Sequence, residues 1–147
     1  MRIYIGADHR GFALKETLKK KLSGHEVIDM GAITHEPTDD FVDYAALVGQ
    51  KVRTEPEARG ILICGSGAGM CIAANKIPGI RCSVGHSSDE VKASRHDDDI
   101  NVLALPADYV SEAQVDDIIN AFLTTEFTPE ARFVRRIGKI TQLETHA

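Results

Sequence analysis

A single thiol beside a glycine-rich turn is the feature of this sequence that most directly suggests chemistry. Cys64 ends the apolar run GILIC, and GSGAG and an apolar, helix-compatible segment follow it. Glycines allow positive φ and let the backbone approach a ligand closely. The first N–H groups of a helix have no intrahelical partner and can bind an anion. The turn could therefore hold a phosphate, a carboxylate or an oxyanion that forms during a reaction.

The position of Cys64 beside this turn suggests a reactive thiolate. An ordinary cysteine thiol, with a pKa of about 8.5, is mostly protonated at neutral pH, and a helix N-terminus nearby favours its thiolate form. A thiolate could remove a proton from carbon or attack an electrophile. The alternatives are a tight turn without a ligand and a buried structural cysteine. The structural interpretation is the one favoured for Cys71 and Cys82, which fall inside an expected helix and an expected strand.

The glycine spacing excludes two common phosphate-binding motifs. No Gly-Lys-Ser/Thr follows the turn, so it is not a P-loop. The pattern G-x-G-x-G also lacks the spacing of the dinucleotide fingerprint.

Two further clusters carry groups that could bind a ligand. The segment ADHRG (7–11) places an acid, an imidazole and a guanidinium in succession after an apolar run. In ARFVRRIGK (131–139), Arg132 and Arg136 are four residues apart and share a helix face. Two guanidinium groups on one face suit a phosphate dianion. The alternative for the second cluster is a solvated basic face.

The acidic stretch SRHDDDIN (94–101) raises the question of a metal site. His96 is followed by three aspartates, but four successive polar residues cannot all point inward. No spaced set of His, Cys or Glu supports them as ligands. We therefore expect a solvated loop with one or two inward groups, and no metal.

Short apolar runs alternate with helix-like segments along the whole chain, so we predict one domain over residues 1–147. This alternation predicts an α/β fold, a doubly wound five-stranded parallel sheet with helices on both faces and a C-terminal helix. Ligands of such sheets gather beyond the carboxyl ends of the strands. The first helix has Phe12, Leu14, Leu18 and Leu22 on one face and lysines on the other. Strands are expected over 2–7, 26–31, 60–65, 80–85 and 101–106, and helices over 11–24, 41–53, 68–76, 88–96, 111–125 (opened by a Ser111–Gln114 capping box) and 129–143.

Composition narrows the class of protein. The net charge of −5 argues against a general nucleic-acid or anionic-membrane binder. Three cysteines cannot all pair within the chain, and there is no CxxC pair and no recognisable export signal. No apolar run approaches the ~18 residues of a membrane span. We expect a soluble, cytoplasmic protein.

Several stretches, in this order, resemble the type B ribose-5-phosphate isomerase family, which includes the galactose-6-phosphate isomerase subunits. They are GADHRGFALKETL, EVIDMG, GILICGSGAGMCIAANKIPGIRC, SR…NVLAL and ARFVRRI. The resemblance implies a Rossmann-like sheet and an aldose–ketose isomerase of sugar phosphates, without metal or organic cofactor. In this family the sugar ring opens, and a base then moves a proton between C1 and C2 through a cis-enediolate. The resemblance also implies a homodimer or homotetramer with active sites at the subunit interface.

The same resemblance assigns roles to individual residues. Cys64 matches the family base, and Ser66 matches a position implicated in ring opening. Asp8 matches a ligand of a substrate hydroxyl. The backbone of Gly65, Gly67, Ala68 and Gly69 resembles the anion hole for the enediolate, and His9, Arg132 and Arg136 match phosphate-binding positions.

Three departures from the family pattern bear on the substrate. Many members read Arg-x-His-Asn-Asp-x-Asn before the last strand, which puts Asp97 at the ring-opening His and Asp98 at the Asn. His96 lies one residue early, so either His96 or Asp97 could serve. Asp108 replaces a phosphate-binding arginine, and Phe133 replaces a histidine. Aspartates repel a dianion but accept hydroxyl hydrogen bonds. Ribose 5-phosphate is the default substrate; the alternatives are another aldose, phosphorylated or not, and a non-catalytic sugar-phosphate binder.

Overall fold

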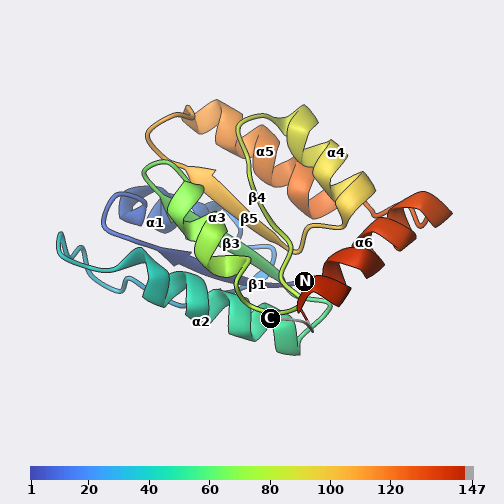
Figure 1. Cartoon of the computed structure of the whole chain (residues 1–147). Coiled ribbons are helices and arrows are strands. Elements are labelled where there is room, and N and C mark those ends of the chain that lie inside the picture. Colours follow the sequence, from blue (N-terminus) through green and yellow to red (C-terminus); the bar gives the residue numbers. More distant parts are fainter. Residues whose placement is uncertain (145–147) are drawn as a thin grey trace.

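Five parallel strands form one sheet in the order β2-β1-β3-β5-β4 in the computed structural model, which describes residues 1–144 (Figure 1). Every neighbouring pair in this sheet is parallel, which confirms the predicted architecture. The strands are β1 (Arg2–Ala7), β2 (Glu26–Asp29), β3 (Arg59–Cys64), β4 (Cys82–Val84) and β5 (Val102–Pro106).

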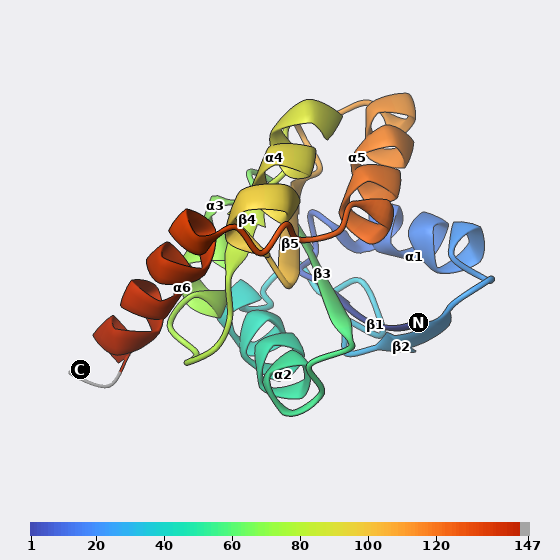
Figure 2. The same cartoon turned by 90° about the vertical axis from the view of Figure 1, so that its right-hand side faces the viewer.

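Helices cover both faces of the sheet, as doubly wound connections require (Figures 1 and 2). One face packs against α1, α4 and α5, and the other packs against α2 and α3. The helices are α1 (Phe12–Lys21), α2 (Phe41–Thr54), α3 (Ala68–Ala74), α4 (Ser88–Asp98), α5 (Glu112–Thr124) and α6 (Ala131–Glu144).

The central strand β3 shows how the sequence divides its side chains between the two cores. Successive side chains of a strand point to opposite faces. Ile61 and Ile63 enter the core under α1 and α5, whereas Leu62 and Cys64 enter the core under α2 and α3. All four are buried, as expected for a strand covered on both faces. Cys64 therefore reaches the carboxyl edge of the sheet on the α3 side.

The predicted capping box at the start of α5 is confirmed, but two other local predictions are wrong. Residues 94–98 continue α4, and the helix ends at Asp99, which has a left-handed conformation with φ 47°. The polar run is compatible with a helix because Arg95 turns inward and donates to Asp99 and to the Ile100 carbonyl. Lys15 was expected on a solvated face of α1, yet it is fully buried.

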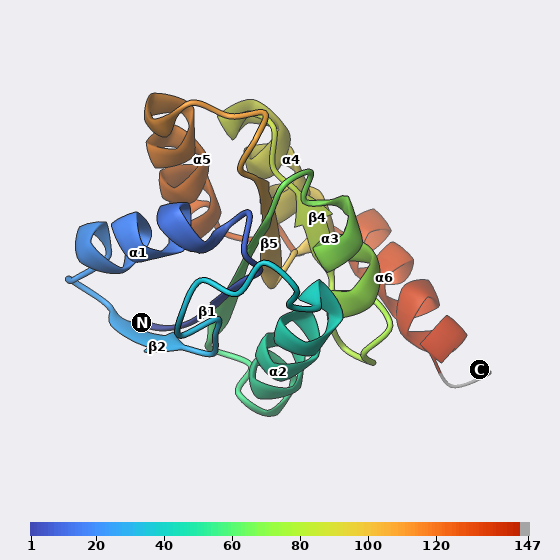
Figure 3. The ribbon, with the colours of Figure 1, turned by 90° about the vertical axis from the view of Figure 1, so that its left-hand side faces the viewer.

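The C-terminal helix α6 lies outside the two helical layers, beside α4 and away from α1 (Figures 2 and 3). Phe133 is the buried residue of this helix within the described chain, whereas Val134 and Leu143 are 51% and 72% exposed. Within residues 1–144, no helix combines the length and apolar character needed to span a bilayer.

Candidate active site

The carboxyl ends of β1 and β3 lie at the position where doubly wound sheets bind ligands. These strands are neighbours, but β1 leads to α1 on one face and β3 leads to α3 on the other. Such a change of direction is the topological switch point of the sheet. Asp8 follows β1, and its N–H donates to the Ile63 carbonyl at 3.2 Å, one residue before Cys64. The structure thus brings the Asp8 segment and the Cys64 turn together, as predicted.

The sulfur of Cys64 is held at the glycine turn. The side chain is only 5% exposed, but the Gly67 N–H donates to its Sγ at 3.1 Å. Gly67 has φ +75°, and a Cβ there would lie 2.9 Å from the Val84 side chain, so glycine is required. Ser66 and Ala68, on either side, are exposed at the entrance of the turn. Cys64 therefore faces the backbone amides that open α3.

An ion pair between Arg10 and Asp108 lies directly over Gly65. The guanidinium contacts the carboxylate, and the Asp108 N–H donates to the Gly65 carbonyl at 3.0 Å. A Cβ at Gly65 would meet the Arg10 guanidinium and the Asp108 carboxylate, so a larger residue there would displace the pair. Sequence reasoning predicted Asp108 as a substrate ligand and placed Arg10 in the ADHRG cluster of groups that could bind a ligand, but it did not predict that the two residues form an ion pair.

Asp8 is buried and shapes the turn after β1. It is 6% exposed, and its Oδ1 accepts hydrogen bonds from the N–H groups of Arg10 and Gly11, both at 3.0 Å. Charged groups are rarely buried without such partners. One carboxylate oxygen of Asp8 is therefore committed to the local fold.

Asp39 orients His9 from a connection far along the sequence. Its Oδ1 accepts from the His9 N–H at 3.2 Å and lies 2.7 Å from His9 Nδ1. The Asp39 side chain is 4% exposed, whereas that of His9 is 32% exposed. Burial and then the Asp39 carboxylate raise the pKa of Tyr44, which approaches from α2. With Nδ1 engaged, the Nε2 atom of His9 is the one left for a ligand.

Buried Lys15 binds the start of the connection between β2 and α2, which contains Asp39. Its Nζ donates to Asp29 Oδ2 and to the Ala32 carbonyl, both at 2.6 Å. Lys19 donates to the same Asp29 oxygen, also at 2.6 Å. Although burial acts in the opposite direction, these two lysines hold the pKa of Asp29 below its ordinary value. The start of this connection is thereby tied to α1.

A second cluster joins the end of α4 to the start of α6. His96 Nδ1 lies 2.6 Å from Asp97 Oδ1, and the His96 ring meets the edge of Phe133 at a centroid distance of 5.8 Å. Arg132 lies on the Phe133 ring, with Cζ 4.4 Å from its centroid, and pairs with Glu130 at 2.8 Å. Phe133 is thus a buried apolar contact for both His96 and Arg132.

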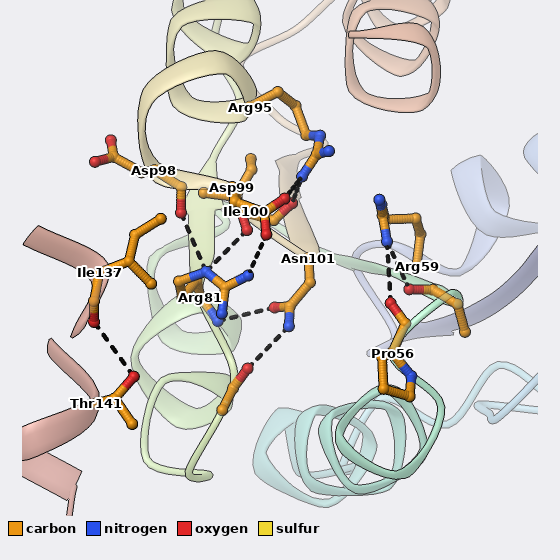
Figure 4. A network of polar contacts seen from close by, with 12 residues as sticks. Pro56, Arg59, Arg81, Arg95, Asp98, Asp99, Ile100, Asn101, Ile137 and Thr141 are labelled. Atoms are coloured by element: carbon orange, nitrogen blue, oxygen red, sulfur yellow. Dashed lines mark hydrogen bonds and ion pairs between the residues drawn. The ribbon is translucent and has the colours of Figure 1, made fainter. Parts of the chain in front are cut away.

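This second cluster lies at the opposite edge of the sheet from Cys64. Arg81, just before β4, donates to the carbonyls of Asp98 and Asp99 at 3.1 and 2.9 Å (Figure 4), so α4 ends near the amino end of β4. Cys64 instead pairs with Pro106, at the carboxyl end of β5. Five strand residues span about 13 Å. The residues that one chain does not bring to Cys64 are His96, Asp97, Asp98, Arg132 and Arg136.

A cavity of about 600 Å³ lies between α6, α4 and the connection from α3 to β4. Its lining includes Asn75, Cys82 and Leu143 but no residue of the Cys64 turn. Within residues 1–144, no three His, Cys, Asp or Glu side chains are grouped so as to hold a metal ion.

Comparison with known proteins places these features in a wider context. The model of the ribose/galactose isomerase family matches residues 3–140. A probable ribose-5-phosphate isomerase B from Mycoplasma pneumoniae is 40% identical over 144 residues, which cover 97% of this chain and 94% of that protein. The ribose-5-phosphate isomerase B structure from Clostridium thermocellum is 41% identical, with a TM-score of 0.92 and 99% of each chain covered. The Mycoplasma genitalium enzyme, with bound ribulose-5-phosphate, is 35% identical, with a TM-score of 0.92 and 99% and 97% covered.

Proposed function

The chain belongs to the ribose/galactose isomerase family, and from that premise we propose that it interconverts ribose 5-phosphate and ribulose 5-phosphate. One observation carries the proposal: the Cys64 sulfur is held by the Gly67 amide at the switch point of the sheet. Relatives named ribose-5-phosphate isomerase B match nearly the whole chain, which supports this substrate pair. The protein is thus an aldose–ketose isomerase.

Cys64 acts as the base of the proposed reaction. After the sugar ring opens, its thiolate removes the proton from C2 of the aldose, and the thiol so formed, whose proton can exchange with water, protonates C1 of the enediolate. The oxyanion of this intermediate is bound by backbone N–H groups between Gly65 and Gly69. Each such donor contributes about 2.7–4 kcal/mol to the stabilisation of a transition state. The buried Asp8 accepts a hydrogen bond from a substrate hydroxyl through its Oδ2 atom, because Oδ1 already accepts from the backbone of the turn.

The pairing of Asp108 with Arg10 favours a phosphorylated substrate. An unpaired carboxylate at this position would repel a dianion. The Arg10 guanidinium compensates the charge of Asp108 and is itself 57% exposed, so it remains available to an anion. His9, oriented by Asp39, contributes Nε2 to the phosphate. This arrangement removes the electrostatic reason for expecting a sugar without phosphate.

The proposed active unit contains at least two copies of the chain, as a homodimer or a homotetramer with shared sites. The second cluster, with His96, Arg132 and Arg136, lies at the wrong edge of the sheet to reach Cys64 of its own chain. Exposed apolar side chains on α3 and α6 support an interface. They include Ile72, Val134 and Leu143, which are 62%, 51% and 72% exposed. A second copy then supplies the cluster to Cys64.

Ring opening is assigned to the His96–Asp97 pair. Asp97 accepts from His96 Nδ1 and fixes the tautomer, so the other ring nitrogen of His96 exchanges the proton with the sugar ring oxygen. Ser66 assists from the exposed entrance of the glycine turn. We assign the protein to the cytoplasm, since its three cysteines are free, as is usual in a reducing compartment.

Isomerisation in deuterated water tests the proposed reaction. The protein is incubated with ribose 5-phosphate, and NMR follows the formation of the ketose and the appearance of deuterium at C1 of the ketose and at C2 of the aldose. Both are expected to appear, and a Cys64→Ala protein should give neither. If galactose 6-phosphate or an unphosphorylated aldose reacts while ribose 5-phosphate does not, the substrate assignment is wrong. A ligand that raises the melting temperature without any turnover across the panel would instead establish a binding protein.

A further inference from the structure

Two cysteines outside the proposed site face each other between α3 and the edge strand β4. The thiol of Cys71 donates to the Cys82 carbonyl at 3.3 Å. Asn75 joins the same two residues: its Nδ2 donates to the Cys82 carbonyl at 2.9 Å and contacts Cys71 Sγ at 3.5 Å, while its Oδ1 accepts from the Cys82 N–H at 2.8 Å. These contacts hold helix and strand in one fixed register. Sequence reasoning treated both cysteines as structural, because they fall inside an expected helix and an expected strand.

The environments of the two thiols are unequal. A hydrogen bond from the Cys82 thiol outweighs burial and, with Asn75, lowers the pKa of Cys71 to about 7. The contact with Cys71 and then burial raise the pKa of Cys82. Cys71 is half-buried, and Cys82 lines the cavity of about 600 Å³ beside α6. One thiol is thus prepared to react, and the other is adjacent and protonated.

We propose that Cys71 and Cys82 form a peroxide-oxidisable pair that closes to an intrachain disulfide between α3 and β4, and that the closed form isomerises its substrate more slowly. The second half of this proposal rests on the proposed function, whereas the first half does not.

The oxidation proceeds in two balanced steps. The Cys71 thiolate attacks one oxygen of hydrogen peroxide, the O–O bond breaks, and the leaving hydroxide takes up a proton to become water. This step leaves Cys71 as a sulfenic acid. The Cys82 sulfur then attacks the Cys71 sulfur, the S–O bond breaks, and a second water leaves with the Cys82 proton. Peroxide is reduced and the two thiols are oxidised to one disulfide.

The disulfide would act on the glycine turn through two contacts. The Cys71 N–H donates to the Gly67 carbonyl at 3.0 Å, and Val84 of β4 already packs closely against Gly67. Hydrogen-bonded sulfurs lie well beyond the ~2.05 Å of an S–S bond, so closure draws α3 and β4 together. The displacement reaches Gly67, whose N–H holds Cys64 Sγ. Since a misplacement of 1 Å can cost about 100-fold, we expect kcat to fall by about ten- to 100-fold.

Peptide mapping of the peroxide-treated full chain tests the disulfide. Trypsin should release residues 60–76 and 82–92 as one linked species, lighter by two hydrogens than the sum of the free peptides and separable by a reductant. Because 60–76 also contains Cys64, the same linkage must persist in Cys64→Ser and disappear in Cys71→Ser. In Cys82→Ser, which keeps a hydrogen-bond donor beside Cys71 but cannot form the disulfide, dimedone should trap a sulfenic acid at Cys71. Linkage that requires Cys64, or no linkage at all, overturns the proposal.

Turnover of the same samples tests the effect on the enzyme. Treated wild-type protein should lose activity and regain it with dithiothreitol, whereas Cys71→Ser and Cys82→Ser should keep theirs. Equal loss in these variants would place the oxidation elsewhere and overturn the proposed control of activity. A chain that forms the disulfide but shows no isomerisation when reduced would contradict the proposed function while supporting the dithiol pair.

Discussion

The two clusters of candidate residues differ in how far they are buried and held in place by contacts within their own chain. At the carboxyl edge of the sheet, Asp8 and the Asp39 side chain are nearly buried and hold backbone or ring atoms. Beside α6, the side chains of His96, Asp97 and Arg132 are 47%, 43% and 57% exposed. The first cluster is preorganised within one chain, whereas the second is displayed on its surface.

This difference separates two tasks. Proton transfer at carbon requires a fixed base and fixed oxyanion donors, and we assign these tasks to Cys64 and the glycine turn, which are held in place at the switch point. Ring opening and phosphate binding can come from a surface that becomes enclosed only on association. The comparison therefore predicts that defects in the first cluster affect chemistry, and that defects in the second can be compensated by another copy of the chain.

Replacement of Cys64, the proposed base, should have the largest effect. In Cys64→Ala, kcat should fall by about 10²- to 10⁴-fold, the usual contribution of a positioned acid or base. The melting temperature should change little, because the variant removes a single sulfur atom. Cys71→Ser, a thiol replacement on the same helix-and-turn unit, is the matched control and should retain kcat. Activity retained in Cys64→Ala would remove this residue as the base.

Mixed oligomers test whether the second cluster serves another chain. Cys64→Ala and the double variant Arg132→Ala/Arg136→Ala should each be nearly inactive at low substrate concentration. When the two are co-expressed as a dimer, about half of the dimers are mixed and each contains one intact site. Activity should then recover to about a quarter of the wild-type value. If both clusters served a single chain, co-expression would give only the average of the two defective proteins.

The residues that sequence reasoning located are those fixed by periodicity and strand ends. Asp8 follows β1 and Cys64 ends β3, so the rule for parallel sheets was sufficient to bring them together. Asp39 escaped prediction, because it reaches His9 across 30 positions through a connection without periodicity. Lys15 was misplaced because helical periodicity cannot show that a lysine will meet Asp29.

In the second cluster, Arg132 and Arg136 were recognised from their helical spacing, whereas the ring-opening role of His96 or Asp97 came from the family resemblance. The sequence could not show how far this cluster lies from Cys64. Strand order and the direction of α4 place His96 at the amino edge, and both are properties of the assembled sheet. Residues 94–98 were also predicted as a loop rather than as the end of α4. The sequence could not show that Arg95 turns inward, because its partners, the carbonyls of Thr125 and Ile100, are set by the tertiary structure.

Asp39→Asn should produce a smaller effect, confined to substrate binding. A hydrogen bond to a charged group contributes about 1.5–3 kcal/mol, so the KM for ribose 5-phosphate should rise about tenfold. The kcat should stay nearly unchanged, because Asp39 acts through His9 and touches no reacting atom. Asp40→Asn is the matched control: Asp40 caps α2, and asparagine caps a helix equally well. A fall in kcat at constant KM would contradict the positioning role of Asp39.

The smallest effect concerns the support beneath the first cluster and appears as a dependence of stability on pH. The Asp29 carboxylate, held by Lys15 and Lys19, has a lowered pKa, so its contribution to the free energy of unfolding is present above the ordinary value of about 3.9. That contribution is lost as the pH falls through the lower folded-state value. Asp29→Asn should therefore be about 2 kcal/mol less stable than wild type near pH 7.

Urea unfolding at pH values between 7 and 2.5 measures this difference, which should shrink once the pH falls below about 4. Asp116→Asn, which removes an exposed partner of Lys21, should differ from wild type by less than about 1 kcal/mol at every pH. If the difference in free energy of unfolding between Asp29→Asn and wild type stays constant with pH, packing and not the Asp29 charge holds Ala32 against α1. In that case the connection that carries Asp39 would be preorganised by packing alone.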